Sequence, residues 1–370
     1  MARQIDTAAM EPGAMPRVAL VYMPFASSRY PSIQLGLLQA ILARHQISAT
    51  THYFNLRFGA RLGWEVFEIF CRQTPRLLGD WLFARAAFGE CAPDPWLYLE
   101  AHRADLEPFA ARFGRGLDYL CRLREEDAPA FVRECLDSVA WDEYDVVGFS
   151  SIFAQNTAAL ALARLVKERH PRLVTVFGGA NFEDEMGVEY VRSVPWIDYA
   201  VIGEGDVAFP ALLKRIASGE EVLALPGVAQ RVGAGVSFGG QAPAVQELDE
   251  LPDPDYAGYF ATAAEVRLPA EVLRHPVTLP YESARGCWWG AKHHCTFCGL
   301  NGLGMVFRSK SPVRVLEGFD ELAARYGVRN FVAVDNILDM RYVREVFGVM
   351  AGRSRGYSFF HEVKANLTRE

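Results

Sequence analysis

The chain has 370 residues, of which 51% are hydrophobic and 22% are charged, so it is a globular protein rather than a disordered one. A chain of this length is expected to form two or three domains. Its formal net charge of -7, without a basic stretch, argues against a nucleic-acid-binding surface, and no uninterrupted apolar run reaches the roughly 20 residues that cross a bilayer.

Strand and helix signals alternate at the start of the chain. Residues 18–23 form a continuous apolar run with β-branched side chains, which predicts a buried parallel strand. A helix over 33–44, capped by Ser32, and a second strand over 49–54 follow it. This order predicts an α/β domain built on a doubly wound parallel sheet.

From about residue 60 to about residue 140, helical spacing replaces the strand pattern and is interrupted by prolines. We interpret this segment as a helical insertion in the sheet domain. Its aromatic side chains are expected to be core packing, and the alternative is that some of them line a ligand pocket. They are Trp64, Phe67, Phe70, Trp81 and Phe83.

The α/β pattern then returns. Strands are expected over 144–151, 173–177 and 199–202, and helices over 156–169 and 208–217. Each strand ends in small or glycine-rich residues. These are Ser150 and Ser151, then Gly178 and Gly179, then Gly203, Glu204 and Gly205. Because ligands of parallel sheets bind at the carboxyl ends of the strands, three such ends in succession predict a ligand crevice.

A proline- and acid-rich segment over 246–275 is interpreted as a linker. It separates a first domain, residues 1–245, from a second domain, residues 276–370. Leu248 and Leu251 in the linker are expected to dock on a neighbouring element.

The second domain repeats the β/α order of part of a barrel, whose chemistry lies at the carboxyl ends of the strands. Strands are expected over 277–283, 330–335 and 357–365, and helices over 312–326 and 340–350. A whole barrel takes roughly 250 residues. We therefore expect either a C-terminally truncated chain of a longer enzyme, which is the favoured interpretation, or a barrel that a partner chain completes.

Three cysteines, Cys287, Cys295 and Cys298, lie on the loop after the first of these strands. Thiolates grouped in this way favour an iron–sulfur cluster or zinc. Three thiolates leave one iron of a four-iron cluster open to a small molecule, whereas structural zinc takes a fourth ligand, for which His293 and His294 are candidates. We predict a reactive iron–sulfur site, with zinc or buried structural cysteines as the alternatives.

The other four cysteines, Cys71, Cys91, Cys121 and Cys135, are scattered among helical segments and are expected to be buried free thiols. Seven cysteines without a compact framework, in a chain whose start lacks an apolar segment of signal-peptide length, predict a reducing, cytoplasmic location.

The residues around the three clustered cysteines carry a family resemblance. The stretch from Glu282 to Cys287, followed by Thr296-Phe297-Cys298, resembles the signature of radical S-adenosylmethionine (SAM) enzymes. The cysteine spacing here is seven residues and then two, whereas three and then two is usual in that superfamily. The longer string CWWGAKHHCTFCGLNG resembles the cobalamin-binding radical SAM enzymes that mature ribosomally made peptides (RiPPs), often as C-methyltransferases.

The resemblance implies a cobalamin-binding first domain followed by part of a radical SAM barrel. It implies three cofactors: a 4Fe-4S cluster on the three cysteines, SAM and cobalamin. Asp335 and Asn336 fall where the ribose or amino group of SAM would be met, although the usual Gly-Gly-Glu run is not evident. The strand-end residues would hold cobalamin, and Glu204 would bond a corrin amide or only stabilise its loop.

Two further features bear on that resemblance. The motif Asp-x-His-x-x-Gly, with which some cobalamin proteins ligate cobalt, is absent because no histidine has an aspartate two places before it. Within the cysteine loop, Lys292, His293 and His294 are candidates to tune the cluster or contact a cofactor, with ordinary loop roles as the alternative. Trp288 and Trp289 are expected to shield the cluster or simply to pack.

The favoured function is a cobalamin-dependent radical C-methyltransferase acting on a precursor peptide, with an external electron donor of the flavodoxin or ferredoxin type and with no nucleic-acid or membrane partner. The first alternative is a radical enzyme of the same architecture that oxidises, cyclises or epimerises a peptide. The second is a non-catalytic zinc or iron–sulfur protein.

Overall fold

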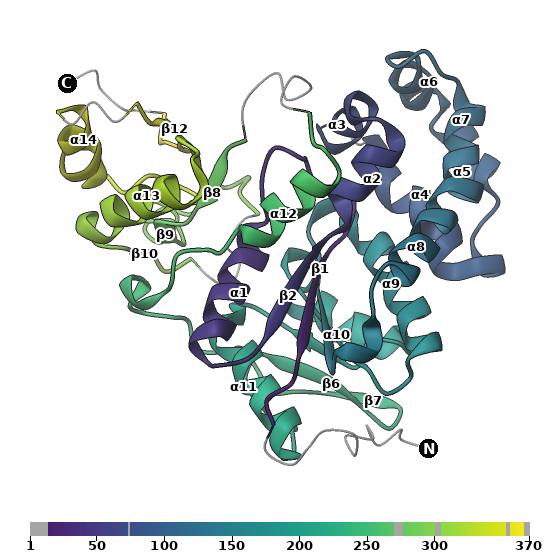
Figure 1. Ribbon diagram of the computed structural model, residues 1–370, viewed down its shortest axis with the longest axis horizontal. Coiled ribbons are helices and arrows are strands. Elements are labelled where there is room, and N and C mark those ends of the chain that lie inside the picture. The colour runs from purple at the N-terminus through teal and green to yellow at the C-terminus, as the bar shows by residue number, and fades with distance from the viewer. Residues whose placement is uncertain (1–13, 73–74, 270–276, 300–304, 353–355, 366–370) are drawn as a thin grey trace. The chain divides into compact units, whose positions relative to one another are not determined.

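The computed structural model describes residues 14–72, 75–269, 277–299, 305–352 and 356–365 (Figure 1). Internal contacts divide the chain into two compact units. The first comprises Met1–Ser28, Leu42–Pro243 and Ala257–Val272, and the second comprises Arg29–Ile41, Ala244–Tyr256 and Leu273–Glu370. In the described part of the chain, no helix combines the length and the apolar character needed to cross a membrane.

The first unit is built on a seven-stranded sheet with the order β2-β1-β3-β4-β5-β6-β7. The strands are β1 (Val18–Tyr22), β2 (Ala49–Tyr53), β3 (Val146–Ser150), β4 (Val174–Gly178), β5 (Tyr199–Val201), β6 (Val228–Val232) and β7 (Gly235–Phe238). The strands from β2 to β5 pair in parallel, as expected from the sequence, and their core strands β1 and β3 are buried throughout. Hydrophobic side chains on both faces explain this burial.

Strands β6 and β7 were not expected from the sequence. They form an antiparallel hairpin that pairs with β5 and extends the parallel sheet at that edge. Their pattern is weak because β6 carries Gln230 and Arg231 and β7 starts with Gly235. Tertiary pairing with β5, rather than local propensity, gives these residues their strand conformation.

One helix follows each of β3, β4 and β5: α9 (Asn156–Arg169), α10 (Asp184–Ser193) and α11 (Gly205–Ser218). Helix α9 has the bounds expected from the sequence. Helix α11 starts three residues earlier and ends one residue later than expected, and Gly219 caps it in the left-handed conformation with φ of 68°.

The segment between β2 and β3 is a helical insertion, as expected. Its helices are α2 (Phe54–Leu62), α3 (Trp64–Arg72), α4 (Leu78–Phe88), α5 (Pro95–Ala101), α6 (Arg103–Ala111), α7 (Leu117–Arg122) and α8 (Ala128–Asp137), with a π-helical turn over Leu123–Asp127. Helix α4 packs against α8 and α9, so the insertion shares the hydrophobic core of the sheet.

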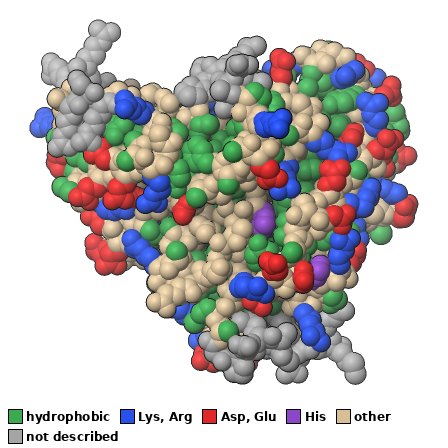
Figure 2. Space-filling view, viewed as in Figure 1, with side chains coloured by type: hydrophobic (Ala, Val, Ile, Leu, Met, Phe, Trp, Pro, Cys, Tyr) green, Lys and Arg blue, Asp and Glu red, His purple; other side chains and the backbone are tan. Residues whose placement is uncertain are grey.

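The insertion's aromatic residues pack in this core, as expected. Phe67, Phe70 and Phe83 are completely buried, and their rings contact Phe25 in the loop after β1. Trp64 and Trp81 are partly buried against the same core. Positive and negative side chains alternate on the surface of the insertion, where they form ion pairs such as Arg61–Glu134 and Arg76–Asp105. Figure 2 shows this mixture on the visible face of the insertion.

Helix α12 (Ala257–Glu265) lies within the segment that the sequence suggested as a linker. It packs on β2, where Tyr53 and Tyr259 meet edge to face at a centroid distance of 5.6 Å. The Tyr259 hydroxyl donates to the Ser28 carbonyl at 2.5 Å. This segment therefore contributes a packed helix to the first unit.

The second unit contains a three-stranded parallel sheet with the order β12-β11-β8. Its elements are β8 (Leu279–Tyr281), β9 (Ala284–Arg285), β10 (Arg308–Ser309), α13 (Pro312–Tyr326), β11 (Asn330–Ala333), a π-helical stretch over Val343–Gly348, α14 (Val349–Ala351) and β12 (Ser358–Phe360). Phe319 of α13 covers the sheet and contacts Tyr281, Phe331 and Phe359. This is the β/α order expected for the start of a barrel.

Two helices of this unit differ in how well their sequence specifies them. Helix α13 has the expected bounds because Ser311 caps it, accepting from the Arg314 amide at 3.2 Å, and Gly327 ends it in the left-handed conformation. The α-helix expected over 340–350 is instead mostly π-helical. Its valines and Gly348 are weak helix formers.

Helix α1 (Ile33–Arg44) contributes most of its length to the second unit. Ser32 caps it as expected, accepting from the Leu35 amide at 3.2 Å. Leu248 and Leu251 dock on its apolar face, which confirms their predicted role.

A buried carboxylate ties the helical insertion to the loop after β1. Glu68 of α3 accepts hydrogen bonds from the Ser28 amide at 2.7 Å and from the hydroxyls of Ser27 and Ser28 at 2.8 and 2.7 Å. Ser28 is completely buried, so its amide and its hydroxyl have no access to solvent as a replacement.

We predict that Glu68→Ala lowers the free energy of unfolding by about 2–3 kcal/mol, because it leaves a buried amide without an acceptor. Urea unfolding followed by circular dichroism measures this loss. Glu65→Ala, on the exposed side of the same helix, is the matched control and should change stability by no more than about 0.5 kcal/mol. Equal effects of the two substitutions would contradict the assigned role of Glu68.

Candidate functional site

The carboxyl ends of the central strands meet at one edge of the first unit's sheet. The order β2-β1-β3-β4-β5 reverses direction between β1 and β3, which is the position where doubly wound sheets bind ligands. Tyr22 at the end of β1 is in register with Ser150, and Ser150 is in register with Gly178. The structure thus brings the predicted serine and glycine pairs together at the switch point.

Hydrogen bonds between the strand-end loops fix their geometry. The Ser151 amide donates to the Gly178 carbonyl at 2.9 Å, and the Asn181 amide donates to the Ser151 carbonyl at 3.2 Å. The Asn181 side chain also donates to the Ser151 hydroxyl at 2.9 Å. These contacts require a close approach at Gly179, whose φ is +96° and where a Cβ atom would lie 2.6 Å from the Ser151 carbonyl oxygen.

Two features at this edge leave room or bonding capacity for a ligand. The Ser150 hydroxyl is buried and has no hydrogen-bond partner within the described residues. Gly203, after β5, has φ of +85°, and a Cβ atom there would meet nothing within 4 Å. Buried polar atoms are normally satisfied, so the orphaned hydroxyl fits a site that bonds a polar group of a ligand.

The remaining predicted residues of this edge lie at the start of α11. Gly205 is its first residue, and Glu204 directly precedes it with a half-buried side chain. The position of Glu204 is compatible with either of its predicted roles.

Sequence reasoning missed Asn181 and Gln155, whose importance depends on contacts across the fold. The Gln155 side chain donates to the Met23 carbonyl at 2.5 Å and accepts from the Ile152 amide at 3.1 Å, which joins the loops after β1 and β3. Asn181 joins the loops after β3 and β4. The only available sequence signal was that both follow a small-residue strand end within a few positions.

In the second unit, β9 leads directly into the loop that carries the three predicted metal ligands. The Cys287 thiol accepts a hydrogen bond from the Gly290 amide at 3.2 Å, and the Cys298 amide donates to the Cys295 carbonyl at 3.0 Å. The structure describes all of residues 287–299, and the three thiols there do not form a group that could hold a metal ion. No other three His, Cys, Asp or Glu side chains in the described ranges form such a group either. The metal role of these cysteines stays a prediction.

A second buried carboxylate holds the chain just before this loop. Asp335, which is 3% exposed, accepts from the amides of Ser283 and Ala284 at 2.8 and 2.9 Å and from the Ser283 hydroxyl. Burial raises the pKa of Asp335 to about 6, against the lowering effect of these hydrogen bonds. Its oxygens are engaged in positioning the strand end, whereas the neighbouring Asn336 is partly exposed.

The tryptophans of the cysteine loop tie it to later segments. The Trp288 indole donates to the Leu338 carbonyl at 2.9 Å. The Lys364 ammonium lies 3.2 Å from the centre of the Trp289 ring, and this cation–π contact joins the loop to the segment after β12. Lys292 and His294 are exposed, and His293 packs beside Trp289 at 4.7 Å between ring centres.

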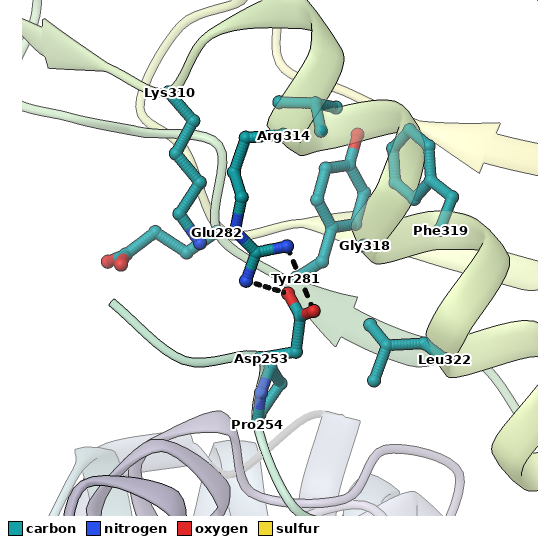
Figure 3. Close-up of a pocket in the computed structure, with 10 residues that line it drawn as sticks. Asp253, Pro254, Tyr281, Glu282, Lys310, Arg314, Gly318, Phe319 and Leu322 are labelled. Atoms are coloured by element: carbon teal, nitrogen blue, oxygen red, sulfur yellow. Dashed lines mark hydrogen bonds and ion pairs between the residues drawn. The ribbon is translucent and has the colours of Figure 1, made fainter. Parts of the chain in front are cut away.

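A small cavity lies beside α13 in the second unit (Figure 3). It measures about 20 Å³, which accommodates one water molecule and not a nucleoside. Figure 3 shows the Arg314 guanidinium facing Asp253. Two of its nitrogens lie 2.9 Å from the Asp253 carboxylate oxygens. Burial lowers the pKa of the nearby Lys310 ammonium. We therefore assign this cavity no cofactor.

Of the four scattered cysteines, Cys135 is buried as expected, whereas Cys71 and Cys121 are only partly buried. All seven cysteines are free thiols, and burial raises the pKa values of Cys71 and Cys135. Cys91 is exposed, contrary to the expectation, because it lies in a short turn after α4 rather than on a helix face.

Comparison with known proteins supports a class for this chain. The model of the B12 binding domain family matches residues 112–213, which include the strand ends of β3, β4 and β5. The cobalamin-dependent radical SAM methyltransferase TokK of Streptomyces tokunonensis is 30% identical over 209 residues, which is 55% of this chain and 29% of TokK.

Solved structures show the same fold. The cobalamin-dependent radical SAM enzyme OxsB with aqua-cobalamin bound matches 93% of this chain and 38% of its own, at 14% identity and a TM-score of 0.59. The radical SAM methyltransferase TsrM of Kitasatospora setae, with cobalamin and a 4Fe-4S cluster bound, matches 92% and 53%, at 13% identity and a TM-score of 0.52. The fold is α/β with a mostly parallel sheet, and the general class supported is that of cobalamin-dependent radical SAM proteins.

The donor chemistry fits both implied groups. At the carboxyl edge of the sheet, the Ser150 hydroxyl has no partner among the described residues and is free to bond an amide group of a ligand. The close approach of the chain at Gly179 and the open space at Gly203 leave room there for a large ligand. Three thiols on one loop fit an iron–sulfur cluster that leaves a coordination position free.

We predict that Gly179→Ala destabilises the protein by at least twice as much as Gly203→Ala. Both substitutions impose a left-handed backbone on alanine, which costs about 1–2 kcal/mol, but only the first also places a Cβ atom against the Ser151 carbonyl. Thermal unfolding of both variants measures the difference. Equal losses would show that the loop after β3 can move away from Gly179.

The pKa of Asp335 predicts a dependence of stability on pH. In the unfolded chain this carboxyl loses its proton near pH 3.8, and in the folded chain near pH 6. The folded state therefore binds more protons between these values, so stability falls as pH rises from about 4 to about 6 and then levels off, by up to about 3 kcal/mol. Asp335→Asn should lose this slope.

The measurement is the difference in unfolding free energy between Asp335→Asn and the wild type at pH values from 4 to 8. Lost hydrogen bonds shift this difference equally at every pH, so the slope identifies the titration. Asp339→Asn is the control with opposite sign: although burial alone would raise the pKa of Asp339, hydrogen bonds from Arg341 and Ser309 lower it. A flat difference for Asp335→Asn would refute the assignment.

Proposed function

We propose that this protein is a cobalamin-dependent radical SAM C-methyltransferase that acts on a ribosomally synthesised precursor peptide. The observation that carries the proposal is the presence, in one chain, of a B12 binding domain match and of a three-cysteine loop at the carboxyl end of strand β8. TokK and TsrM are both methyltransferases, which supports the methylating outcome over other radical outcomes.

The chain's own residues have distinct roles in this proposal. Cys287, Cys295 and Cys298 hold a 4Fe-4S cluster and leave one iron for SAM, while Ser150 and its neighbours at the sheet edge hold cobalamin. When bound, these groups supply radical generation and a transferable methyl group, and the protein orients and shields them. The buried Asp335 fixes the strand end from which the cysteine loop starts.

The loop tryptophans serve the exclusion of water. Trp288 is fixed by its bond to the Leu338 carbonyl, and Trp289 is covered by the Lys364 ammonium. Both rings belong to the loop that carries the three thiols, and their role in the proposal is to limit solvent access to it.

The peptide substrate and the flavodoxin- or ferredoxin-type electron donor rest on the resemblance of the string that starts at Cys287. A cytoplasmic location agrees with an electron donor of this type and with seven free thiols.

The test is anaerobic reconstitution of the full chain with iron, sulfide and hydroxocobalamin, followed by metal analysis and an absorption spectrum. We expect about four irons and one cobalt per chain. Zinc alone, or iron without cobalt, would overturn the methyltransferase proposal.

Within the same experiment, Cys295→Ala should abolish iron binding because it removes one of three thiolate ligands, while cobalt binding persists. Cys121→Ala removes a thiol of the helical insertion and is the matched control, with iron content like that of the wild type. Equal iron content in the two variants would contradict the assignment of Cys295 as a cluster ligand.

A further inference from the structure

An exposed aromatic side chain stands at the carboxyl edge of the central strand. Phe153, three residues beyond the end of β3, is 85% exposed. Its φ is 47°, a left-handed conformation that is unusual for a bulky residue. Exposure of the ring and strain of the backbone are both unfavourable, and such outliers concentrate at sites of function.

The surrounding loop is held firmly in this conformation. The Asn181 side chain donates to the Phe153 carbonyl at 2.9 Å while also bonding Ser151. Gln155, two residues later, anchors the loop to the Met23 carbonyl. Segments on both sides of β3 therefore fix the backbone of the loop, and this fixed backbone carries the exposed ring.

The position of Phe153 suggests what the ring contacts. It lies inside the segment that matches the B12 binding domain, three residues after Ser150, whose buried hydroxyl has no partner among the described residues. The loops that follow β1, β3, β4 and β5 contain no histidine, all of them being described. The protein thus offers, at this edge, a large apolar ring and no imidazole.

We propose that Phe153 contacts bound cobalamin and packs its ring against the apolar surface of the corrin macrocycle. This inference rests on the proposed function of the sheet, and it assigns a determinant of affinity to a residue outside the serine and glycine pairs. Burying a phenylalanine that is exposed in the free protein favours the complex, and the rigid loop keeps the cost of ordering small.

The test is titration of the full chain with hydroxocobalamin, followed by visible absorption, for the wild type and three variants. Phe153→Gly should weaken binding at least tenfold because it removes the ring. Phe153→Leu keeps an apolar side chain and should retain most of the affinity. Val232→Ala is the matched control, since Val232 is an exposed apolar residue of β6 beyond the amino end of β5 and should bind like the wild type.

Thermal unfolding of the cobalamin-free protein separates binding from folding. Glycine tolerates a positive φ, so the melting temperature of Phe153→Gly should not fall. A marked fall would show that the ring packs within the protein and would overturn the inference. Unchanged affinity of Phe153→Gly overturns the inference alone, whereas a wild type that binds no cobalamin overturns the proposed function with it.

Discussion

In both units, the loop after the first strand is held by a buried carboxylate that accepts three hydrogen bonds from that loop. Glu68 serves the loop after β1, and Asp335 serves the residues after β8. A parallel strand leaves its last amides without partners, and burial makes each unpaired amide costly. Satisfying these donors with a carboxylate from a distant segment fixes the chain directly after each of the two strands.

This constraint explains why the helical insertion shares a core with the sheet instead of forming a separate lobe. The insertion delivers Glu68 to β1, and its Asp80 accepts from the Thr157 amide at the start of α9, at 2.9 Å. Burial raises the pKa of Asp80, with the Thr157 contact opposing it. Phe25 joins both parts by packing among the insertion's phenylalanines. The loops beside the switch point are therefore held in place by residues far away in the sequence.

The sequence predicted what local signals encode. Helices α1, α9 and α13 have the expected bounds because amphipathic spacing, a capping serine or a terminal glycine defines them. The serine and glycine pairs were placed correctly at one edge because parallel strands end together. The hairpin β6–β7 and the π-helical stretch were missed, since pairing with β5 and packing against α13 decide their conformation. Phe153 was missed for a similar reason: an ordinary phenylalanine in the sequence gives no sign of a left-handed backbone.

The contacts of the cysteine loop also govern the order in which the second unit can fold. Trp288 meets Leu338, and Trp289 meets Lys364, so both partners leave the ribosome well after the loop itself. Contacts across such separations form only after the entropy of closing the intervening chain has been overcome. During synthesis the loop therefore does not have both contacts until the segment after β12 has emerged. The final conformation of the cysteine loop thus belongs to a late stage of folding.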